Sequence, residues 1–173
     1  VVLDDFEAAD ALFFFGQNVG SNSPRMLHQL KDASDRGATI VAFNPLRERG
    51  LERFTDPQNP VQMATLGETP IAREYFQVRP GGDMAVVAGM CRWLIETDAE
   101  ARAEGRPALL DHEFLAQHTH GFSEFSEWVL AQDWADIERE AGLSRSQIEL
   151  AAQLYAEAPA AMVIYGMGIT QHK

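Results

Sequence analysis

Two short, uninterrupted apolar runs, separated by one helical pattern, constrain the fold of this chain most strongly. Residues 10–16 read Asp-Ala-Leu-Phe-Phe-Phe-Gly, and residues 38–43 read Ala-Thr-Ile-Val-Ala-Phe. Such runs are typical of strands that are buried on both faces, as in a parallel sheet. Between them, apolar residues from Met26 to Ala33 recur at helical spacing. The pattern predicts a right-handed βαβ unit.

The boundaries of the first helix carry their own signals. Ser23 stands where an N-cap is expected, Pro24 suits the first helical position, and Gly37 is a typical C-terminal residue. Residues 74–78 predict a third strand. Residues 79–82 predict a turn that connects this strand to a helix starting near Asp83. The expected apolar side of that helix consists of Met84, Val87, Met90, Cys91, Leu94 and Ile95.

The rest of the chain divides into a long excursion and a helical segment. Residues 46–73 are punctuated by Pro and Gly and predict an irregular excursion with a short helix near Leu51. Residues 99–107 predict a solvated connection. Helical spacing follows over residues 110–118, 122–131, 135–141 and 144–158, with Ser144 as an N-cap, and residues 160–165 predict a last strand.

These elements predict one α/β domain over residues 1–173. The expected fold is Rossmann-like, with a mainly parallel sheet flanked by helices and an extra helical segment before the last strand. The first residue is Val rather than Met, so we expect a processed terminus or a piece of a longer chain.

Composition excludes several classes of protein. The chain has 14 Lys and Arg against 26 Asp and Glu, a net charge of −12, which argues against nucleic acid as a partner. No apolar run approaches the roughly 20 residues of a membrane helix, and we expect a cytoplasmic protein. Cys91 is the only cysteine, so this chain alone cannot form a disulfide, a four-thiolate zinc site or a four-cysteine iron–sulfur cluster.

The segment after the first strand is a candidate phosphate site. Residues 16–22, Gly-Gln-Asn-Val-Gly-Ser-Asn, feed a helix N-terminus, where backbone amides and the helix dipole stabilise an anionic diphosphate. The glycine spacing departs from G-x-G-x-x-G, so a plain βα turn is an equal alternative. The second strand ends in Asn44, where a nicotinamide-dinucleotide protein usually has Asp or Glu, which disfavours NAD.

Two further segments are candidates for ligand contact. Asp83 at a helix N-terminus offers two carboxylate oxygens, which match the paired N1–H and N2 donors of guanine; the alternative is that it only caps its helix. Residues 166–172 follow the last strand, where open α/β sheets bind ligands, and Gln171 offers both a donor and an acceptor. A simple turn explains that segment equally well.

Other reactive residue types favour structural roles. His118 and His120 resemble a metal pair, but nothing supplies a third ligand. Cys91 on an apolar helix face favours a buried hydrophobic residue rather than a nucleophile. Glu138 and Glu140 are two apart on a helix and point in different directions, which favours a solvated face. We therefore predict no metal ligand and no catalytic residue in this chain.

Six strings together resemble one family. They are residues 15–26 (Phe-Gly-Gln-Asn-Val-Gly-Ser-Asn-Ser-Pro-Arg-Met), 37–47 (Gly-Ala-Thr-Ile-Val-Ala-Phe-Asn-Pro-Leu-Arg), 78–83 (Val-Arg-Pro-Gly-Gly-Asp), 114–122, 142–144 and 166–172. In order and separation they are similar to the molybdopterin-dependent oxidoreductases of the formate dehydrogenase alpha-subunit and dimethyl sulfoxide reductase group. Residues 45–54 look most like a formate-dehydrogenase-like branch.

The resemblance implies a cofactor and a set of contacts. Members of this family are longer, multidomain enzymes that hold molybdenum on two molybdopterin guanine dinucleotides, and this chain resembles only an internal dinucleotide-binding domain. The resemblance places the first loop against the phosphates, the second against the ribose and guanosine, the Gly-Gly-Asp turn against guanine, and the last loop towards the pterin. The implied cofactor-binding residues are Phe15, Gly16, Gln17, Asn18, Gly20, Ser21, Asn22, Phe43, Asn44, Pro45, Arg47, Gly81, Gly82, Asp83, Met167, Gly168 and Gln171.

The family's metal ligand and iron–sulfur cysteines precede this domain, so the resemblance implies that any cluster belongs to the full-length protein and that this chain alone is inactive. The implied partners are the remaining domains of the same enzyme, and exposed apolar faces also predict self-association. Two alternatives stay open, namely an NAD-type dehydrogenase domain and a non-catalytic acidic interaction module. The residues at 56–70 form an insertion to which the sequence assigns no role.

Overall fold

The computed structural model describes residues 3–65 and 67–171, which form two compact units. Residues up to Gly81, together with those from Ala158 onward, make up the sheet unit. Residues Gly82–Glu157 make up the helical unit. The α/β class predicted from the sequence is confirmed, with the extra helices preceding the last strand.

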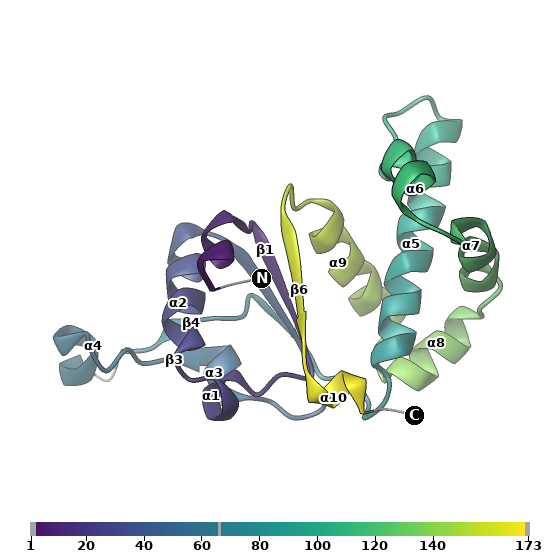
Figure 1. The fold of residues 1–173 in the computed structure, drawn as a ribbon. Coiled ribbons are helices and arrows are strands. Elements are labelled where there is room, and N and C mark those ends of the chain that lie inside the picture. The colour runs from purple at the N-terminus through teal and green to yellow at the C-terminus, as the bar shows by residue number, and fades with distance from the viewer. Residues whose placement is uncertain (1–2, 66, 172–173) are drawn as a thin grey trace. The chain divides into compact units, whose positions relative to one another are not determined.

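The sheet unit is built on a parallel sheet of four strands (Figure 1). The strand order is β5-β2-β1-β6, and each neighbouring pair is parallel. In register, Phe13 pairs with Val41 on one side and with Val163 on the other. The strand bounds are Ala11–Phe15 for β1, Thr39–Phe43 for β2, Glu74–Phe76 for β5 and Ala161–Tyr165 for β6.

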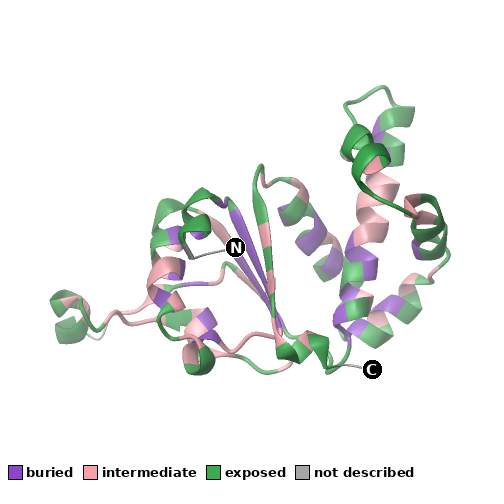
Figure 2. Cartoon of the chain, viewed as in Figure 1, coloured by how far each residue is buried: buried purple, intermediate pink, exposed green. Residues whose placement is uncertain are grey.

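Burial explains why the two central strands are uninterrupted apolar runs. All of β1 and almost all of β2 are buried (Figure 2). One face of the sheet packs Leu12, Phe14 and Ile40 against α2 (Met26–Arg36) and against Phe6 of η1 (Leu3–Ala8). The other face carries a stack of Phe rings, in which the ring centroids of Phe15 and Phe43 lie 4.3 Å apart and the ring planes are nearly parallel. Because both faces of these strands are buried, polar alternation is absent from them.

The predicted βαβ unit is confirmed, although its helix starts later than expected. Ser23 and Pro24 lie in a turn before α2, whose first residue is Met26. The preceding loop contains an additional short helix, α1 (Val19–Asn22), which is capped by Asn18. Gly37 ends α2 in the left-handed conformation with φ 96°, as its position predicted.

The excursion after β2 is more ordered than the sequence indicated. The expected short helix near Leu51 is α3 (Arg49–Glu52). An antiparallel pair follows, formed by β3 (Arg53–Phe54) and β4 (Thr69–Pro70). Between them, α4 (Pro60–Thr65) lies at the far end of an extension that points away from the sheet (Figure 1). The prediction of an irregular segment was wrong here, because polar side chains supply order that apolar periodicity does not reveal.

Five helices make up the helical unit. They are α5 (Asp83–Ala103), α6 (His112–His118), α7 (Phe122–Leu130), α8 (Trp134–Ala141) and α9 (Arg145–Ala156). All were expected, but α5 continues through residues 99–103, which were predicted as a solvated connection. The bounds of the four shorter helices lie within two residues of the predicted ones.

The buried face of α5 also differs from the prediction. Met90 is buried, as predicted, but Met84 is 76% exposed and Val87 44% exposed, whereas Val86 and Gly89, which were not predicted, are buried. At Gly89 an added Cβ would lie 2.8 Å from a side-chain carbon of Ile148 and 3.0 Å from one of Ile137. A residue without a side chain thus lets α8 and α9 approach α5 closely, and hydrophobic periodicity does not register such a contact.

A reciprocal capping box begins α9, and its removal is a first testable prediction. Ser144 caps the backbone of Gln147, and the Gln147 side chain accepts from the Ser144 N–H at 3.0 Å. We expect Ser144→Ala to lower the free energy of unfolding by about 1 kcal/mol, because an N–H of the first turn loses its acceptor. Urea unfolding followed by circular dichroism measures this, with Ser123→Ala on exposed α7 as the control. Equal stabilities for both variants would contradict the assigned cap.

Candidate functional site

Three of the predicted cofactor loops lie at one edge of the sheet. Because β1, β2 and β6 are parallel, residues 16–22, 44–47 and 166–171 all follow carboxyl ends of strands at the same edge. The short helices α1 and α10 (Met167–Thr170) both lie there (Figure 1). We call this group of three loops the rim.

Backbone and amide hydrogen bonds join the first two loops of the rim. The Gly16 N–H donates to the Phe43 carbonyl at 2.9 Å. The Asn44 side-chain amide donates to the Gln17 carbonyl at 3.1 Å, and its backbone N–H donates to the Phe76 carbonyl. Asn44 therefore holds the first loop in place and ties it to the end of the second strand.

Glycines join the first loop to the third. Gly16 has a φ of 61°, which favours glycine. A Cβ added at Gly168 would lie 2.7 Å from the Gly16 carbonyl oxygen, and one added at Gly166 would lie 2.5 Å from Nε2 of Gln17. At Gly168 the two loops are thus in direct backbone contact, with no room for a side chain, whereas the close neighbour of Gly166 is the end of the Gln17 side chain. Gly168, predicted to let backbone approach a ligand, first lets backbone approach backbone.

Exposure separates the rim residues that can touch a ligand from those that support the loops. The rings of Phe15 and Phe43 are buried at 5% and 0% exposure, so they form the floor of the rim rather than its surface. Gly16, Gln17, Asn18, Gly20, Asn44 and Pro45 are partly exposed, and Ser21, Asn22, Arg47, Met167, Gly168 and Gln171 are exposed. The exposed hydroxyl, amide and guanidinium groups are hydrogen-bond donors that suit phosphate and ribose oxygens.

Two rim side chains already have internal partners. The Asn18 side-chain oxygen accepts from the Ser21 N–H at 2.9 Å and so starts α1. The Arg47 guanidinium lies 2.6 Å from a Glu52 carboxylate oxygen and 5.3 Å from the centre of the Tyr75 ring. Both contacts orient the side chains while leaving them accessible to solvent.

Sequence reasoning missed the residues that hold the second loop. The Tyr75 hydroxyl donates to the Leu46 carbonyl at 2.8 Å and accepts from the Glu48 N–H at 2.9 Å. Burial raises the pKa of Tyr75, so the hydroxyl remains a donor at neutral pH. The Gln77 amide donates to the Pro45 carbonyl at 2.8 Å. Their only sequence signal is their position on and just after the third strand.

The predicted guanine-contacting turn spans the boundary between the units. Gly81, with φ 81°, closes the first stretch of the sheet unit, and Gly82 and Asp83 open the helical unit. Asp83 is the first residue of α5 and is 7% exposed. A Cβ at Gly82 would lie 2.5 Å from the Glu140 carbonyl oxygen, so this turn packs tightly on the end of α8. Recognition of guanine by Asp83 stays a prediction.

The remaining reactive residues have structural partners or surroundings. Nε2 of His112 lies 2.8 Å from an Asp98 carboxylate oxygen. Within residues 3–65 and 67–171, no group of three or more His, Cys, Asp and Glu residues is arranged to hold a metal ion. Burial raises the pKa of the Cys91 thiol, which disfavours the reactive thiolate. His172, part of the last motif, lies outside the described residues.

Across the described parts of the chain, no helix combines the length and the apolar character that crossing a bilayer requires.

Comparisons with known proteins place the chain within longer ones. No family model matches it. It is 54% identical over 173 residues to Protein YdeP of Escherichia coli K12, of which it covers 23%. It is 38% identical over 172 residues to the uncharacterized oxidoreductase Rv2900c of Mycobacterium tuberculosis H37Rv and 26% identical over 169 residues to formate dehydrogenase H of Escherichia coli K12, covering 21% and 20% of them. The chain thus spans about a fifth to a quarter of these relatives.

The fold is also found among solved structures. Acetylene hydratase from Pelobacter acetylenicus, for example, matches with a TM-score of 0.72 and 22% identity, over 94% of this chain and 19% of that one. This likeness shows the α/β fold. The names of the relatives relate the chain to a segment of oxidoreductases, in agreement with the sequence resemblance.

Proposed function

We propose that the rim binds the guanosine and diphosphate end of a molybdopterin guanine dinucleotide within a larger oxidoreductase. The observation that carries the proposal is the convergence of three strand-terminal loops at one edge of a parallel sheet, held together by Asn44 and by the Gly16–Gly168 contact. Ligands of open α/β sheets bind at such edges. The relatives named oxidoreductase and formate dehydrogenase support this reading.

The rim residues suit different parts of that cofactor. The exposed Ser21 and Asn22 side chains provide neutral donors for the diphosphate, and the preorganised Arg47 provides a positive charge beside the ribose. Gln171 provides an amide towards the pterin end. The resemblance assigns guanine to Asp83, which belongs to the helical unit and not to the rim. Molybdenum on the bound cofactor supplies a two-electron oxidation or reduction, for which formate oxidation is the leading candidate.

The geometry disfavours an NAD-type dehydrogenase. In such proteins an acidic side chain after the second strand accepts hydrogen bonds from the ribose hydroxyls. Here the corresponding Asn44 carries no charge, and its side-chain Nδ2 donates to the Gln17 carbonyl. Only the neutral Oδ1 is left to accept from a ribose hydroxyl, and it is a weaker acceptor than a carboxylate.

Nucleotide titration tests the proposal. We expect calorimetric titration to show GDP binding more tightly than ADP and NAD, and Asp83→Asn to remove that preference while leaving the phosphate contribution intact. Asp136→Asn, on the exposed surface of α8, is the matched control and should keep it. NAD preference would support a dehydrogenase domain, and absence of binding to all three nucleotides would support an interaction module.

The chain alone should not turn over substrate. The family resemblance places the molybdenum ligand in a segment that precedes this domain, and the proposal assigns the chain cofactor binding only. We expect a dye-coupled formate oxidation assay to give no rate with this chain and a rate with the longer polypeptide that contains it. Formate oxidation by the chain itself would contradict the assignment of cofactor binding alone to this chain.

A further inference from the structure

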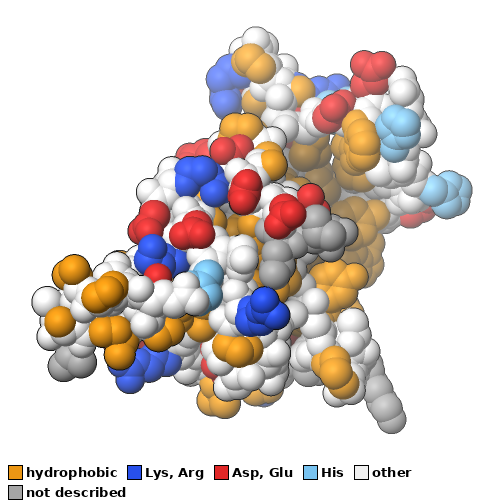
Figure 3. Space-filling view, turned by 60° about the vertical axis from the view of Figure 1, so that its left-hand side comes forward, with side chains coloured by type: hydrophobic (Ala, Val, Ile, Leu, Met, Phe, Trp, Pro, Cys, Tyr) orange, Lys and Arg blue, Asp and Glu red, His pale blue; other side chains and the backbone are white. Residues whose placement is uncertain are grey.

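The extension between β3 and β4, described over residues 55–65 and 67–68, carries apolar side chains that no other described part of the sheet unit covers. We call it the arm. None of the α4 residues is buried, and Val61 and Met63 are 68% and 54% exposed. Figure 3 shows hydrophobic side chains gathered over this projecting part of the molecule. A helix of one and a half turns that buries nothing gains no stability from packing, so something else must order it.

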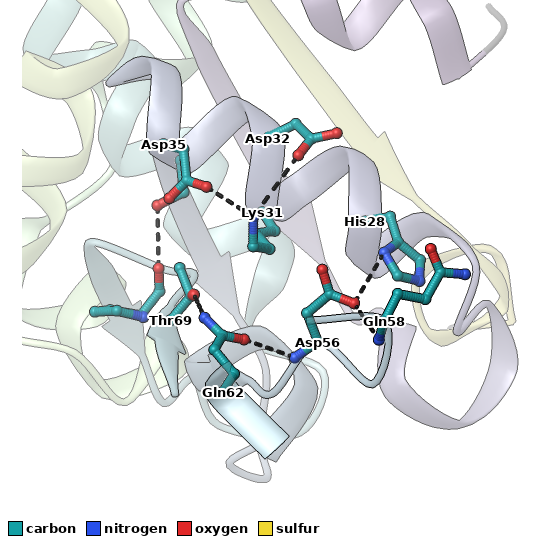
Figure 4. Close-up of polar contacts among 10 residues, drawn as sticks. His28, Lys31, Asp32, Asp35, Asp56, Gln58, Gln62 and Thr69 are labelled. Atoms are coloured by element: carbon teal, nitrogen blue, oxygen red, sulfur yellow. Dashed lines mark hydrogen bonds and ion pairs between the residues drawn. The ribbon is translucent and has the colours of Figure 1, made fainter. Parts of the chain in front are cut away.

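A polar network orders the arm from within (Figure 4). The Gln62 amide accepts from the Asp56 N–H at 2.9 Å and donates to the Thr69 hydroxyl at 2.9 Å, so it bridges the two sides of the arm. Asn59 caps the start of α4 by accepting from the N–H groups of Val61 and Gln62. Gln62 therefore faces the interior of the arm, whereas Val61 and Met63 are presented to solvent.

A hollow of about 720 Å³ lies beside the base of the arm. Its lining includes Pro24 and Arg25 just before α2, Leu27 and His28 in α2, and Phe54, Pro57 and Gln58 at the base of the arm. His28 lies edge-on to the Phe54 ring at 5.3 Å and 3.8 Å from the Asp56 carboxylate. This hollow, which we call the groove, has the size of a small-molecule pocket and ample space for two apolar side chains.

The arm does not fill its own groove, because Val61 and Met63 remain exposed. The projecting residues and the groove nevertheless lie on one unit, separated by only a few residues of chain. An interface with two-fold symmetry requires a patch that contains both a projection and the hollow that accepts it. The arm and the groove together meet that requirement.

Charge favours a second copy as the occupant. The chain has a net charge of −12, so two copies repel over most of their surfaces. Residues 57–67 contain no Asp, Glu, Lys or Arg, although 23% of the chain is charged. The arm is thus a segment through which two acidic copies can meet without bringing like charges together.

We propose that two copies of this chain pair by arm exchange, with Val61 and Met63 of each arm seated in the groove of the other copy. The contact is independent of the rim and of its proposed cofactor. It involves fewer residues than a standard interface, so a dissociation constant of about 10–100 µM is expected.

Sedimentation velocity over a range of concentrations tests the pairing. Wild type should shift from monomer to dimer, and Met63→Asp should weaken the dimer about 10-fold or more, because the apolar contacts of the Met63 side chain with Leu27, Phe54 and Pro57 in the groove are lost. Since α4 buries nothing, this variant should keep the wild-type melting temperature. Leu46→Asp is the control, because Leu46 is 71% exposed but lies outside the arm and the groove, and it should dimerise as wild type does.

A crosslink identifies the contact itself. In a Cys91→Ala background, Met63→Cys and Gln58→Cys copies carrying different tags are mixed and oxidised. Arm exchange predicts disulfides between the two kinds of copy in excess of those within either kind. A monomer at all concentrations, an unaltered dimer in Met63→Asp, or no preference for the mixed disulfide would each overturn the proposal.

Discussion

A Gly168→Ala variant is expected to lose about 2–3 kcal/mol of stability and about 10-fold in GDP affinity. The added methyl carbon would lie 2.7 Å from the Gly16 carbonyl oxygen and 3.3 Å from its Cα. Because both atoms are backbone, the clash is relieved only by moving the first loop against the third. The rim would open at the point where its loops meet. Urea unfolding and calorimetric titration measure the two effects.

Gly20→Ala is the matched control for that result. Its added Cβ would lie 3.4 Å from Cα of Gly50, an ordinary contact, and Gly20 belongs to the same rim loop as Gly16. We expect it to unfold at nearly the wild-type urea concentration. If both variants were equally stable, the backbone contact between the loops would not be as close as the structure shows.

An Asp98→Ala variant is expected to lose about 3 kcal/mol, or roughly 10 °C in melting temperature. Asp98 is 3% exposed and anchors the segment that follows α5. Its carboxylate accepts from the backbone N–H groups of Leu109 and Leu110 at 2.8 and 3.0 Å, and lies 2.8 Å from His112. Truncation leaves two backbone donors without an acceptor. Thermal unfolding measures the loss, with the exposed Asp136→Ala as control.

The pH dependence of this contribution has a definite sign. Burial raises the pKa of Asp98, but hydrogen bonds from Leu110, His112 and Leu109 outweigh it and hold the pKa below its ordinary value. A carboxyl with a depressed pKa in the folded state stabilises the fold above its unfolded pKa of about 3.9, and this stabilisation is lost as the pH falls through the folded value. The difference in the free energy of unfolding between wild type and Asp98→Asn should therefore be largest at pH 6 and shrink below about pH 4. A gap that widens on acidification would contradict the assigned shift.

Apolar periodicity and terminal residues were sufficient to predict the parallel sheet. The runs at 10–16 and 38–43 have no polar alternation because both faces are buried, and Gly37 and Ser144 mark helix ends by their local chemistry. Each of these signals depends on only a few neighbouring residues, so it can be recognised in the sequence without knowledge of the tertiary structure.

The structure of the arm and the buried face of α5 depend on tertiary contacts, and the sequence did not reveal them. The arm is held by Gln62, whose two partners lie six and seven residues away, a pattern with no apolar period. The face of α5 was misassigned because Gly89, rather than a large side chain, makes its closest contact. Met84 was counted as core because it fits helical spacing, yet it is 76% exposed.

The sequence likewise predicted some features of the candidate site and not others. The strand ends at Phe15, Phe43 and Tyr165 predicted which loops share an edge, because parallel strands end together. The sequence did not reveal that Tyr75 and Gln77 hold the second loop, or that Gly166 and Gly168 serve loop packing. Those roles depend on contacts between segments that are far apart in the chain.

The most direct test of the rim as a nucleotide site is an amide nuclear magnetic resonance titration of the chain with GDP and, separately, with ADP. The account predicts saturable shifts for GDP that cluster at residues 16–22, 44–47 and 166–171, and weaker ones for ADP. Shifts confined to other segments, or equal responses to both nucleotides, would contradict it.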